Sequence, residues 1–298
     1  MLGANHTVTI TASDVDATEQ IYSKYLGFQT VAKSNVSGDL AASWGAPAAA
    51  GQRQLVMQPE SGELSFLRFV EGGAMADYRP LTTYGWNSTE IVVQDLYALN
   101  DRLLDSPFEI IGAPAALEFE GLDMISAMQV VSPSKEVLYL TQISGPVPGF
   151  ELPEAKSFVG RVFITILSGK SIEQISAFFD KAFGVSATEP GEGVIRVVNQ
   201  AQDLPSDHKT TISTISLTKQ NLIEVDAWPA DTTSDRRKID GHLPPAQAIV
   251  TFEHENLDAL SVPFITPPQA RNEPPYNGSR AATLVGSTGE LIELIETD

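Results

Sequence analysis

The sequence contains no cysteine, which excludes disulfide bonds, thiolate metal sites and cysteine nucleophiles together. It also lacks any apolar run close to the roughly 18 residues that a membrane-spanning helix requires. The first residues, MLGANHTVTITASD, contain neither the basic segment nor the hydrophobic stretch of a secretory signal. We therefore expect a cytoplasmic protein with no membrane partner.

Basic residues are scarce, with 19 lysines and arginines against 38 aspartates and glutamates and a formal net charge of −19. Such an excess of negative charge disfavours contact with nucleic acid or anionic lipid. Aromatic residues make up 8% of the chain and are scattered, so they predict no platform for stacking bases. We expect no nucleic-acid partner. Solubility is the ordinary explanation of this charge, and adaptation to salt is the alternative.

The common catalytic motifs are also missing. The chain has no phosphate-binding glycine loop, no GxSxG elbow and no HExxH helix. Its 298 residues are enough for two domains of about 150 residues, each with its own core.

What the sequence does contain is a fourfold repeat of a strand, a turn, a helix and further strands. In the first unit the strand VTITASD leads into the helix DATEQIYSKYLGF, whose apolar residues recur at helical spacing before Gly27. The corresponding turn residues of the four units are Asp14, Asp95, Ser171 and Asn256, at intervals of 81, 76 and 85 residues. This regularity predicts four βαβββ units.

Residues 145–156, GPVPGFELPEAK, hold three prolines and two glycines and divide the repeats into two pairs. We predict an N-terminal domain over residues 1–145, a linker over 146–156 and a C-terminal domain over 157–298. The units pair either as one with two and three with four, or as one with four and two with three. Residues 266–280 predict a long loop that either covers a pocket mouth or is a plain surface excursion.

The pattern DxxAxxxxYxxxLGF and the closing strand GELIELIE resemble the vicinal oxygen chelate superfamily, which includes glyoxalase I, extradiol dioxygenases and bleomycin-resistance proteins. The residues that carry the resemblance are Asp14, Ala17, Tyr22, Leu26, Gly27, Phe28 and 289–293. It covers nearly the whole chain and implies an α+β fold in which four βαβββ modules form two pseudo-symmetric open barrels around a small molecule. It leaves the reaction open, because that fold hosts isomerases, lyases, dioxygenases and binding proteins.

The resemblance also implies where a metal would be held, by one residue from the first strand and one from the last strand of each paired unit. The first-strand positions are Thr7, Ser88, Ile164 and Ile249, and the last-strand positions are Arg68, Tyr139, Glu224 and Glu293. Two carboxylates are too few for a catalytic divalent ion. We therefore expect no cofactor. The alternative is a divalent metal held by His6, which adjoins the Thr7 position, together with Glu224 and Glu293.

We predict the catalytic residues instead in the N-terminal domain, in the cavity that its curved sheet would enclose. Alternate residues of a strand share a face. We therefore expect Thr9 to lie on the same face as Thr7, and Glu90 on the same face as Ser88. Arg68 is predicted to bind an anionic or carbonyl oxygen, with Glu90 as general base and Tyr139 as hydrogen-bond donor or acid. The expected ligand-binding residues are Thr7, Thr9, Phe66, Trp86, Ser88, Met128 and Gln129. The alternatives are an internal ion pair between Arg68 and Glu90, and solvent-facing roles for Glu224 and Glu293.

The sequence thus predicts a small-molecule enzyme, a metal-independent lyase or isomerase acting on a hydrophobic or aromatic oxygenated metabolite. One alternative is a metal-dependent extradiol dioxygenase or glyoxalase-type enzyme. The other is a non-catalytic protein that binds or sequesters a small molecule. The expected partner is the small-molecule substrate, and a homodimer is left open.

Overall fold

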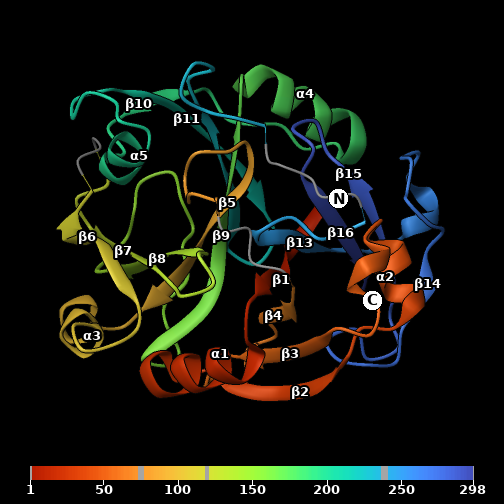
Figure 1. The fold of residues 1–298 in the computed structure, drawn as a ribbon. Coiled ribbons are helices and arrows are strands. Elements are labelled where there is room, and N and C mark those ends of the chain that lie inside the picture. The colour runs from red at the N-terminus through yellow and green to blue at the C-terminus, as the bar shows by residue number, and fades with distance from the viewer. Residues whose placement is uncertain (1, 73–76, 118–120, 236–240, 298) are drawn as a thin grey trace.

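The structure is a computed structural model that describes residues 2–72, 77–117, 121–235 and 241–297 (Figure 1). Its strands form two curled sheets of eight strands each. Sheet one runs in the order β14 (Gln269–Ala270), β15 (Arg280–Val285), β16 (Leu291–Glu296), β13 (Ala246–His254), β1 (Leu2–Ala12), β4 (Phe66–Glu71), β3 (Arg53–Gln58) and β2 (Gln29–Asn35). Sheet two runs in the order β10 (Gly191–Gly193), β11 (Thr210–Leu217), β12 (Asn221–Ala227), β9 (Val159–Gly169), β5 (Gly85–Val93), β8 (Val137–Ile143), β7 (Ile125–Val131) and β6 (Glu109–Ala116).

The helices are short and lie in the connections between strands. They are α1 (Val15–Ile21) with a π-helical turn (Tyr22–Leu26), α2 (Gly38–Ser43), α3 (Leu96–Leu103), α4 (Ile172–Phe183), α5 (Arg196–Ala201) and two 3₁₀ helices (Pro47–Ala49 and Leu257–Ala259). No helix in the described ranges has the length and apolar character needed to cross a bilayer.

The fourfold repeat is confirmed by the way its turn residues are used. Asp14, Asp95, Ser171 and Asn256 each occupy the N-cap of the helix after the first strand of a unit, and each side chain accepts a hydrogen bond from a backbone N–H of the first turn. Such caps satisfy donors that a helix start otherwise leaves unbonded. In unit four the helix is reduced to a single 3₁₀ turn.

The two sheets establish which units pair. In sheet one, β1 of unit one lies antiparallel to β13 of unit four, and in sheet two β5 of unit two lies antiparallel to β9 of unit three. The pairing is therefore one with four and two with three. Each sheet takes strands from both sides of residues 146–156, so the sheets cross the predicted domain boundary.

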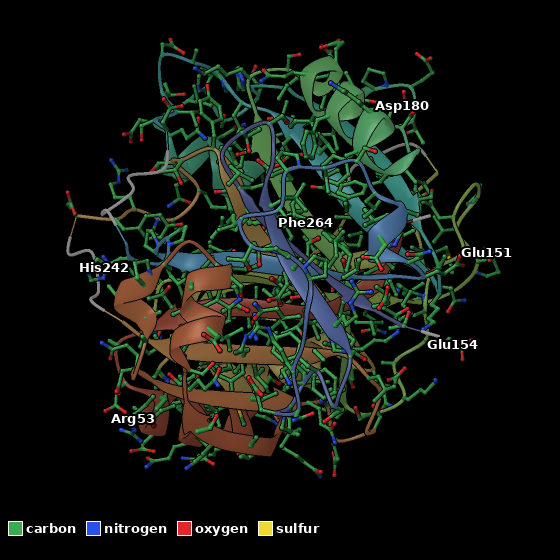
Figure 2. All side chains as sticks on the ribbon, turned by 90° about the vertical axis from the view of Figure 1, so that its right-hand side faces the viewer. Arg53, Glu151, Glu154, Asp180, His242 and Phe264 are labelled. Carbon is green, nitrogen blue, oxygen red and sulfur yellow. The ribbon has the colours of Figure 1, made fainter. Side chains whose placement is uncertain are left out.

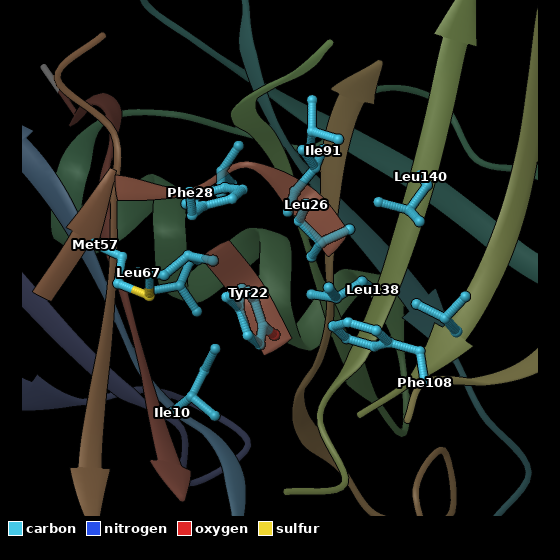
Figure 3. Packing of buried hydrophobic residues seen from close by; sticks show 14 of the residues in the cluster. Ile10, Tyr22, Leu26, Phe28, Met57, Leu67, Ile91, Phe108, Leu138 and Leu140 are labelled. Carbon is cyan, nitrogen blue, oxygen red and sulfur yellow. The ribbon is translucent and has the colours of Figure 1, made fainter. Parts of the chain in front are cut away.

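The hydrophobic cores follow the other division of the chain. One cluster joins the helices and strands of units one and two, including Tyr22, Phe69 and Leu138, and extends to Val162. Tyr22 and Phe108 both lie in this cluster (Figure 3). Their ring centroids are 5.6 Å apart. A second cluster joins units three and four, with Leu2 and Trp86 added. Units that share no sheet therefore share a core, which ties the two sheets together.

In every unit the last strand alternates between a core residue and a residue on the opposite face of the sheet. Leu67 and Phe69 enter the first core on either side of Arg68, and Leu138 and Leu140 do so on either side of Tyr139. Ile223 and Val225 flank Glu224 in the second core, as Ile292 and Leu294 flank Glu293. We call the face of sheet one that carries Arg68 and Glu293 cup one, and the face of sheet two that carries Tyr139 and Glu224 cup two.

Candidate functional site

The predicted catalytic residues are divided between the two cups. Glu90 on β5 is the register partner of Tyr139 on β8, so these two lie side by side in cup two. Arg68 lies on β4 in cup one, where Thr9 of β1 is its register partner. The prediction that Arg68 acts with Glu90 and Tyr139 was wrong, as was the alternative ion pair between Arg68 and Glu90. The reason is that unit one pairs with unit four rather than with unit two.

Cup one is organised around an ion pair between Arg68 and Glu293, which are 0% and 1% exposed. Arg68 Nη2 lies 3.0 Å from Glu293 Oε2, and Arg68 Nε donates a hydrogen bond to Thr9 Oγ1 at 2.9 Å. Thr251 Oγ1 donates to Glu293 Oε2 at 2.7 Å. Burial alone would raise the pKa of Glu293, but the charge of Arg68 and these hydrogen bonds hold it below its usual value.

Two aromatic side chains close cup one. Trp44, at the end of α2, donates from Nε1 to Glu293 Oε1 at 2.9 Å, and the Tyr276 hydroxyl donates to the same oxygen at 2.8 Å. Arg68 Nη1 in turn donates to the Tyr276 hydroxyl at 2.5 Å, and its guanidinium lies 4.6 Å from the Trp44 ring centroid. Tyr276 belongs to the predicted loop 266–280, which therefore covers this cup. The side chains of Arg68, Glu293, Trp44 and Tyr276 therefore meet at the centre of cup one.

Unit one contributes three residues that were predicted to bind a ligand, Thr7, Thr9 and Phe66, and all three lie in cup one. His6 Nδ1 lies 2.8 Å from Thr7 Oγ1, and the His6 ring centroid is 5.2 Å from that of Phe66. Burial lowers the pKa of His6 to about 4, so this imidazole is neutral at neutral pH. Thr9 is already bonded to Arg68.

The residues at the former ligand positions do not fit a divalent metal in either cup. In cup one they are Thr7, Arg68, Ile249 and Glu293, and the guanidinium already holds the single carboxylate. In cup two they are Ser88, Tyr139, Ile164 and Glu224, again with one carboxylate. The alternative ligand set of His6, Glu224 and Glu293 is split between the two sheets. Across the described ranges, no three histidine, aspartate or glutamate side chains are placed to hold a metal ion.

Cup two is built on the four central strands of sheet two. Glu90 on β5 faces Tyr139 on β8 and Ile164 on β9, while Glu224 on β12 faces Ile166 on β9. Because directly opposed residues share a face of a sheet, Glu90 and Glu224 lie on the same face with β9 between them. Thr141 Oγ1 donates to Glu90 Oε1 at 2.5 Å.

At the positions that correspond to Arg68 and Glu293, and close to them, cup two leaves polar side chains without hydrogen-bond partners among the described residues. Tyr139, Glu224 and Gln129 are half-buried, and within the described residues none of the three side chains makes a hydrogen bond. Ser88, two residues from Glu90, is 2% exposed, and its buried hydroxyl has no hydrogen-bond partner in the described structure. Buried polar groups in proteins are nearly always bonded. These side chains are therefore suited to bonding a ligand.

Three carboxyl groups in cup two have raised pKa values. Burial raises the pKa of Glu90 and that of Asp226, two residues beyond Glu224, to about 7 in each case. Burial, followed by repulsion from Asp226 and Glu90, raises the pKa of Glu224 well above its ordinary value. Glu224 is surrounded by the curled sheet even though solvent reaches part of its side chain. Glu90 can therefore change its protonation state near neutral pH.

Tyr139 remains a proton donor throughout this range. Burial raises the pKa of its hydroxyl well above the usual value, and the charges of Glu224, Asp226 and Glu90 act in the same direction. A neutral tyrosine hydroxyl beside a carboxyl group that titrates near pH 7 is an arrangement suited to general acid–base chemistry.

Apolar side chains form two walls of cup two. Ile164, Ile166 and Leu222 pack with Phe150 and Leu152, which come from the predicted linker. Glu151 and Glu154 of that segment are exposed at the surface (Figure 2). On another side α5 contributes Val197 and Val198, in a cluster that includes Tyr139.

Two residues that were predicted to line the ligand site, Met128 and Trp86, lie in the hydrophobic cores instead. Met128 alternates with Gln129 on β7 and is fully buried in the core of units one and two. Trp86 packs in the core of units three and four, where Nε1 donates to the Leu291 carbonyl at 2.8 Å. A register shift in β5 between Trp86 and Ser88 breaks the alternation that the prediction assumed. Sequence reasoning missed Asp226, although its spacing of two from Glu224 would have indicated a shared face.

A cavity of about 390 Å³ lies outside both cups, where Tyr84 and Trp86 of unit two approach the turn before β16. Its buried acid, Glu290, already accepts hydrogen bonds from the backbone N–H and hydroxyl of Thr288, both at 2.7 Å. We therefore assign this cavity no role.

Comparison with solved structures finds the same fold. Glyoxalase I from Zea mays superposes with a TM-score of 0.63 at 15% identity, covering 98% of this chain and 92% of that chain. A candidate dioxygenase from Bacillus subtilis gives 0.65 at 13% identity, covering 99% and 85%. No family model and no curated protein matches the sequence. The architecture of paired βαβββ units is therefore that of glyoxalase I, and the chain has the fold of the vicinal oxygen chelate superfamily.

Proposed function

We propose that the chain is a small-molecule enzyme, a lyase or isomerase that works by proton transfer in cup two without a bound metal. The observation that carries the proposal is the pairing of Glu90 with Tyr139 on one face of sheet two, beside polar side chains that have no hydrogen-bond partner among the described residues. In cup one the corresponding side chains, Arg68 and Glu293, are bonded to each other and to their neighbours.

The chemistry begins with Glu90 as base. Its carboxylate takes a proton from a carbon next to a carbonyl, and the electron pair of the broken C–H bond moves onto the carbonyl oxygen. The Tyr139 hydroxyl donates a hydrogen bond to that oxygen as negative charge develops there. The carbonyl then re-forms and the electron pair returns to carbon. In an isomerisation the pair moves through an adjacent C=C bond to another carbon, which takes the proton back from Glu90. In a lyase reaction the pair forms a new C=C bond as the C–O bond to the neighbouring carbon breaks, and Glu90 gives its proton to the departing hydroxyl group, which leaves as water.

The walls of cup two favour an oxygenated substrate with a hydrophobic or aromatic body. Ile164, Ile166, Leu222 and Phe150 offer apolar contact, while Gln129 and Tyr139 are free within the described structure to bond oxygen atoms. A mainly apolar site with a few converging polar groups is typical of small-molecule binding.

A non-catalytic binding protein is the second candidate. It is favoured by the environment of Glu224, where burial raises the pKa well above its ordinary value and so favours the neutral carboxyl group, which can donate a hydrogen bond to a ligand. Under that alternative, Glu90 would line the cup without exchanging protons with the ligand.

Deuterium exchange distinguishes the two candidates. The protein is incubated in D₂O with a panel of apolar carbonyl compounds, and exchange at the carbon next to the carbonyl is followed by NMR. An enzyme should label at least one compound, Glu90→Gln should abolish the labelling, and Tyr139→Phe should slow it. Glu136→Gln is the matched control, because Glu136 is a fully buried carboxyl outside both cups. Labelling that survives Glu90→Gln would contradict the proposal.

A further inference from the structure

We infer that the ligand of cup two carries a protonated amine on its apolar body. This inference rests on the proposed function in one respect, that cup two is the binding site. It adds the charge of the ligand, which the acid–base proposal leaves open.

The first observation is the concentration of acids. Glu224 and Asp226 share a face of β12 because they are two residues apart, and Glu90 shares that face across β9. In the described part of the chain, none of the three forms an ion pair, and no lysine, arginine or histidine acts on their pKa values. In cup one, by contrast, Arg68 neutralises Glu293. Among the described residues, cup two therefore has carboxyl groups and no cation paired with them.

The second observation is independent of charge. Asp226 Oδ1 is buried without a hydrogen-bond partner in the described structure, although Trp228 Nε1 donates to Oδ2 of the same carboxyl at 3.2 Å. The Ser88 hydroxyl is likewise unpartnered and buried, and lies on the row of opposed residues that runs through Ile166 to Glu224. Both oxygens can accept a hydrogen bond, and neither has a donor among the described residues. An ammonium group supplies three N–H donors and accepts none.

Charge and hydrogen bonding therefore favour the same ligand. Ionising several neighbouring carboxyl groups at the base of a curled sheet is costly unless a cation accompanies them. A bound ammonium provides that cation, so Glu224 and Asp226 can ionise when the ligand is present. A carboxylate or phosphate ligand would instead add a further negative charge beside these carboxyl groups. The apolar wall of Ile164, Ile166 and Phe150 would hold the rest of the molecule.

Three probes with one ring and different charge test the inference in the unmodified protein. Benzylamine, benzyl alcohol and benzoate are titrated at pH 7 by isothermal calorimetry. Benzylamine should bind at least about tenfold more tightly than benzyl alcohol, and benzoate should not bind measurably, because like charges in one site repel. Equal or weaker binding of benzylamine relative to benzyl alcohol overturns the inference, and so does binding of benzoate.

Variants then locate the effect. Glu224→Gln and Asp226→Asn should each lower the affinity for benzylamine severalfold while changing that for benzyl alcohol less than about twofold, since only the charged contact is removed. Glu136→Gln, the buried control, should change neither. If the two cup variants leave the benzylamine affinity unchanged, the inference fails.

The two proposals can fail separately. Selective binding of benzylamine through Glu224 together with no deuterium exchange supports the charge of the ligand and overturns the catalytic role of Glu90. Exchange that depends on Glu90, in a protein that prefers benzyl alcohol, does the reverse. If none of the three probes binds, the inference about the charge of the ligand fails, and the deuterium-exchange experiment alone decides the catalytic role of Glu90.

Discussion

Arg68 Nη2 lies 3.0 Å from Glu293 Oε2, and this contact joins side chains 225 residues apart in the chain. The corresponding positions of the other two units are occupied by Tyr139 and Glu224, which are half-buried and have no partner in the described structure. The pseudo-symmetry of the fold thus allows a direct comparison of the two cups. In cup one these positions form an ion pair with further hydrogen bonds, and in cup two the side chains at the same positions make no hydrogen bond within the described residues.

The ion pair of cup one should matter for stability. Arg68→Ala leaves the Glu293 carboxylate buried without its cation, and we expect a loss of about 3–5 kcal/mol in the free energy of unfolding. Urea denaturation followed by circular dichroism measures it. The double variant Arg68→Met with Glu293→Leu should recover most of the loss, because neither buried charge then remains. Arg53→Ala, which breaks an exposed pair with Asp16, should have little effect.

Folding stability should depend on pH through Glu90. Burial raises its pKa from 4.5 in the unfolded chain to about 7 in the folded protein. Its contribution is therefore fully present below pH 4.5 and is lost as the pH rises through 7, at a cost of about 3 kcal/mol once the group is ionised. Glu90→Gln should be more stable than the natural protein at pH 8 and close to it at pH 4.5. Thermal melts across this range measure the difference, and parallel curves would contradict the assignment.

The same group should set the pH dependence of turnover. A base that must be ionised to accept a proton becomes active as the pH rises through its pKa. Deuterium exchange catalysed by the protein should therefore increase from pH 6 to pH 8, with its midpoint near 7. A profile that is flat over this range would exclude Glu90 as the base.

A second buried contact should hold units one and two together. The Tyr22 hydroxyl donates to Glu136 Oε1 at 2.5 Å, and both side chains are fully buried. Burial raises the pKa of Glu136, with its hydrogen bonds from Ser132 and Tyr22 opposing the rise. Tyr22→Phe removes one of these donors and should destabilise the fold by about 1–3 kcal/mol. A double-mutant cycle with Glu136→Gln tests the coupling, and additive effects would show that the contact contributes nothing.

The fourfold repeat could be predicted from the sequence because the patterns that indicate it are local. An N-cap such as Asp95 and the apolar spacing of the helix after it are set by neighbours within a few residues. Alternation also placed Glu90 and Ser88 on one face, as the structure has them.

The pairing of units could not be predicted in the same way. Each unit offers a first strand with similar alternation, so β1 could pair with β5 or with β13 on local grounds. The choice depends on contacts between residues more than 200 positions apart, such as Thr7 with Thr251. That choice moved Arg68 out of the predicted site. The closure of cup one by Tyr276 was equally out of reach, because it depends on how a loop packs.

The central claim is that cup two, and not cup one, receives the ligand. Isoleucine methyl groups report on both, since Ile164 and Ile166 line cup two while Ile249 and Ile295 lie in cup one. In a methyl NMR titration with benzylamine and then with benzyl alcohol, we predict shifts at Ile164 and Ile166 and none at Ile249 and Ile295. Shifts confined to Ile249 and Ile295 would contradict the account.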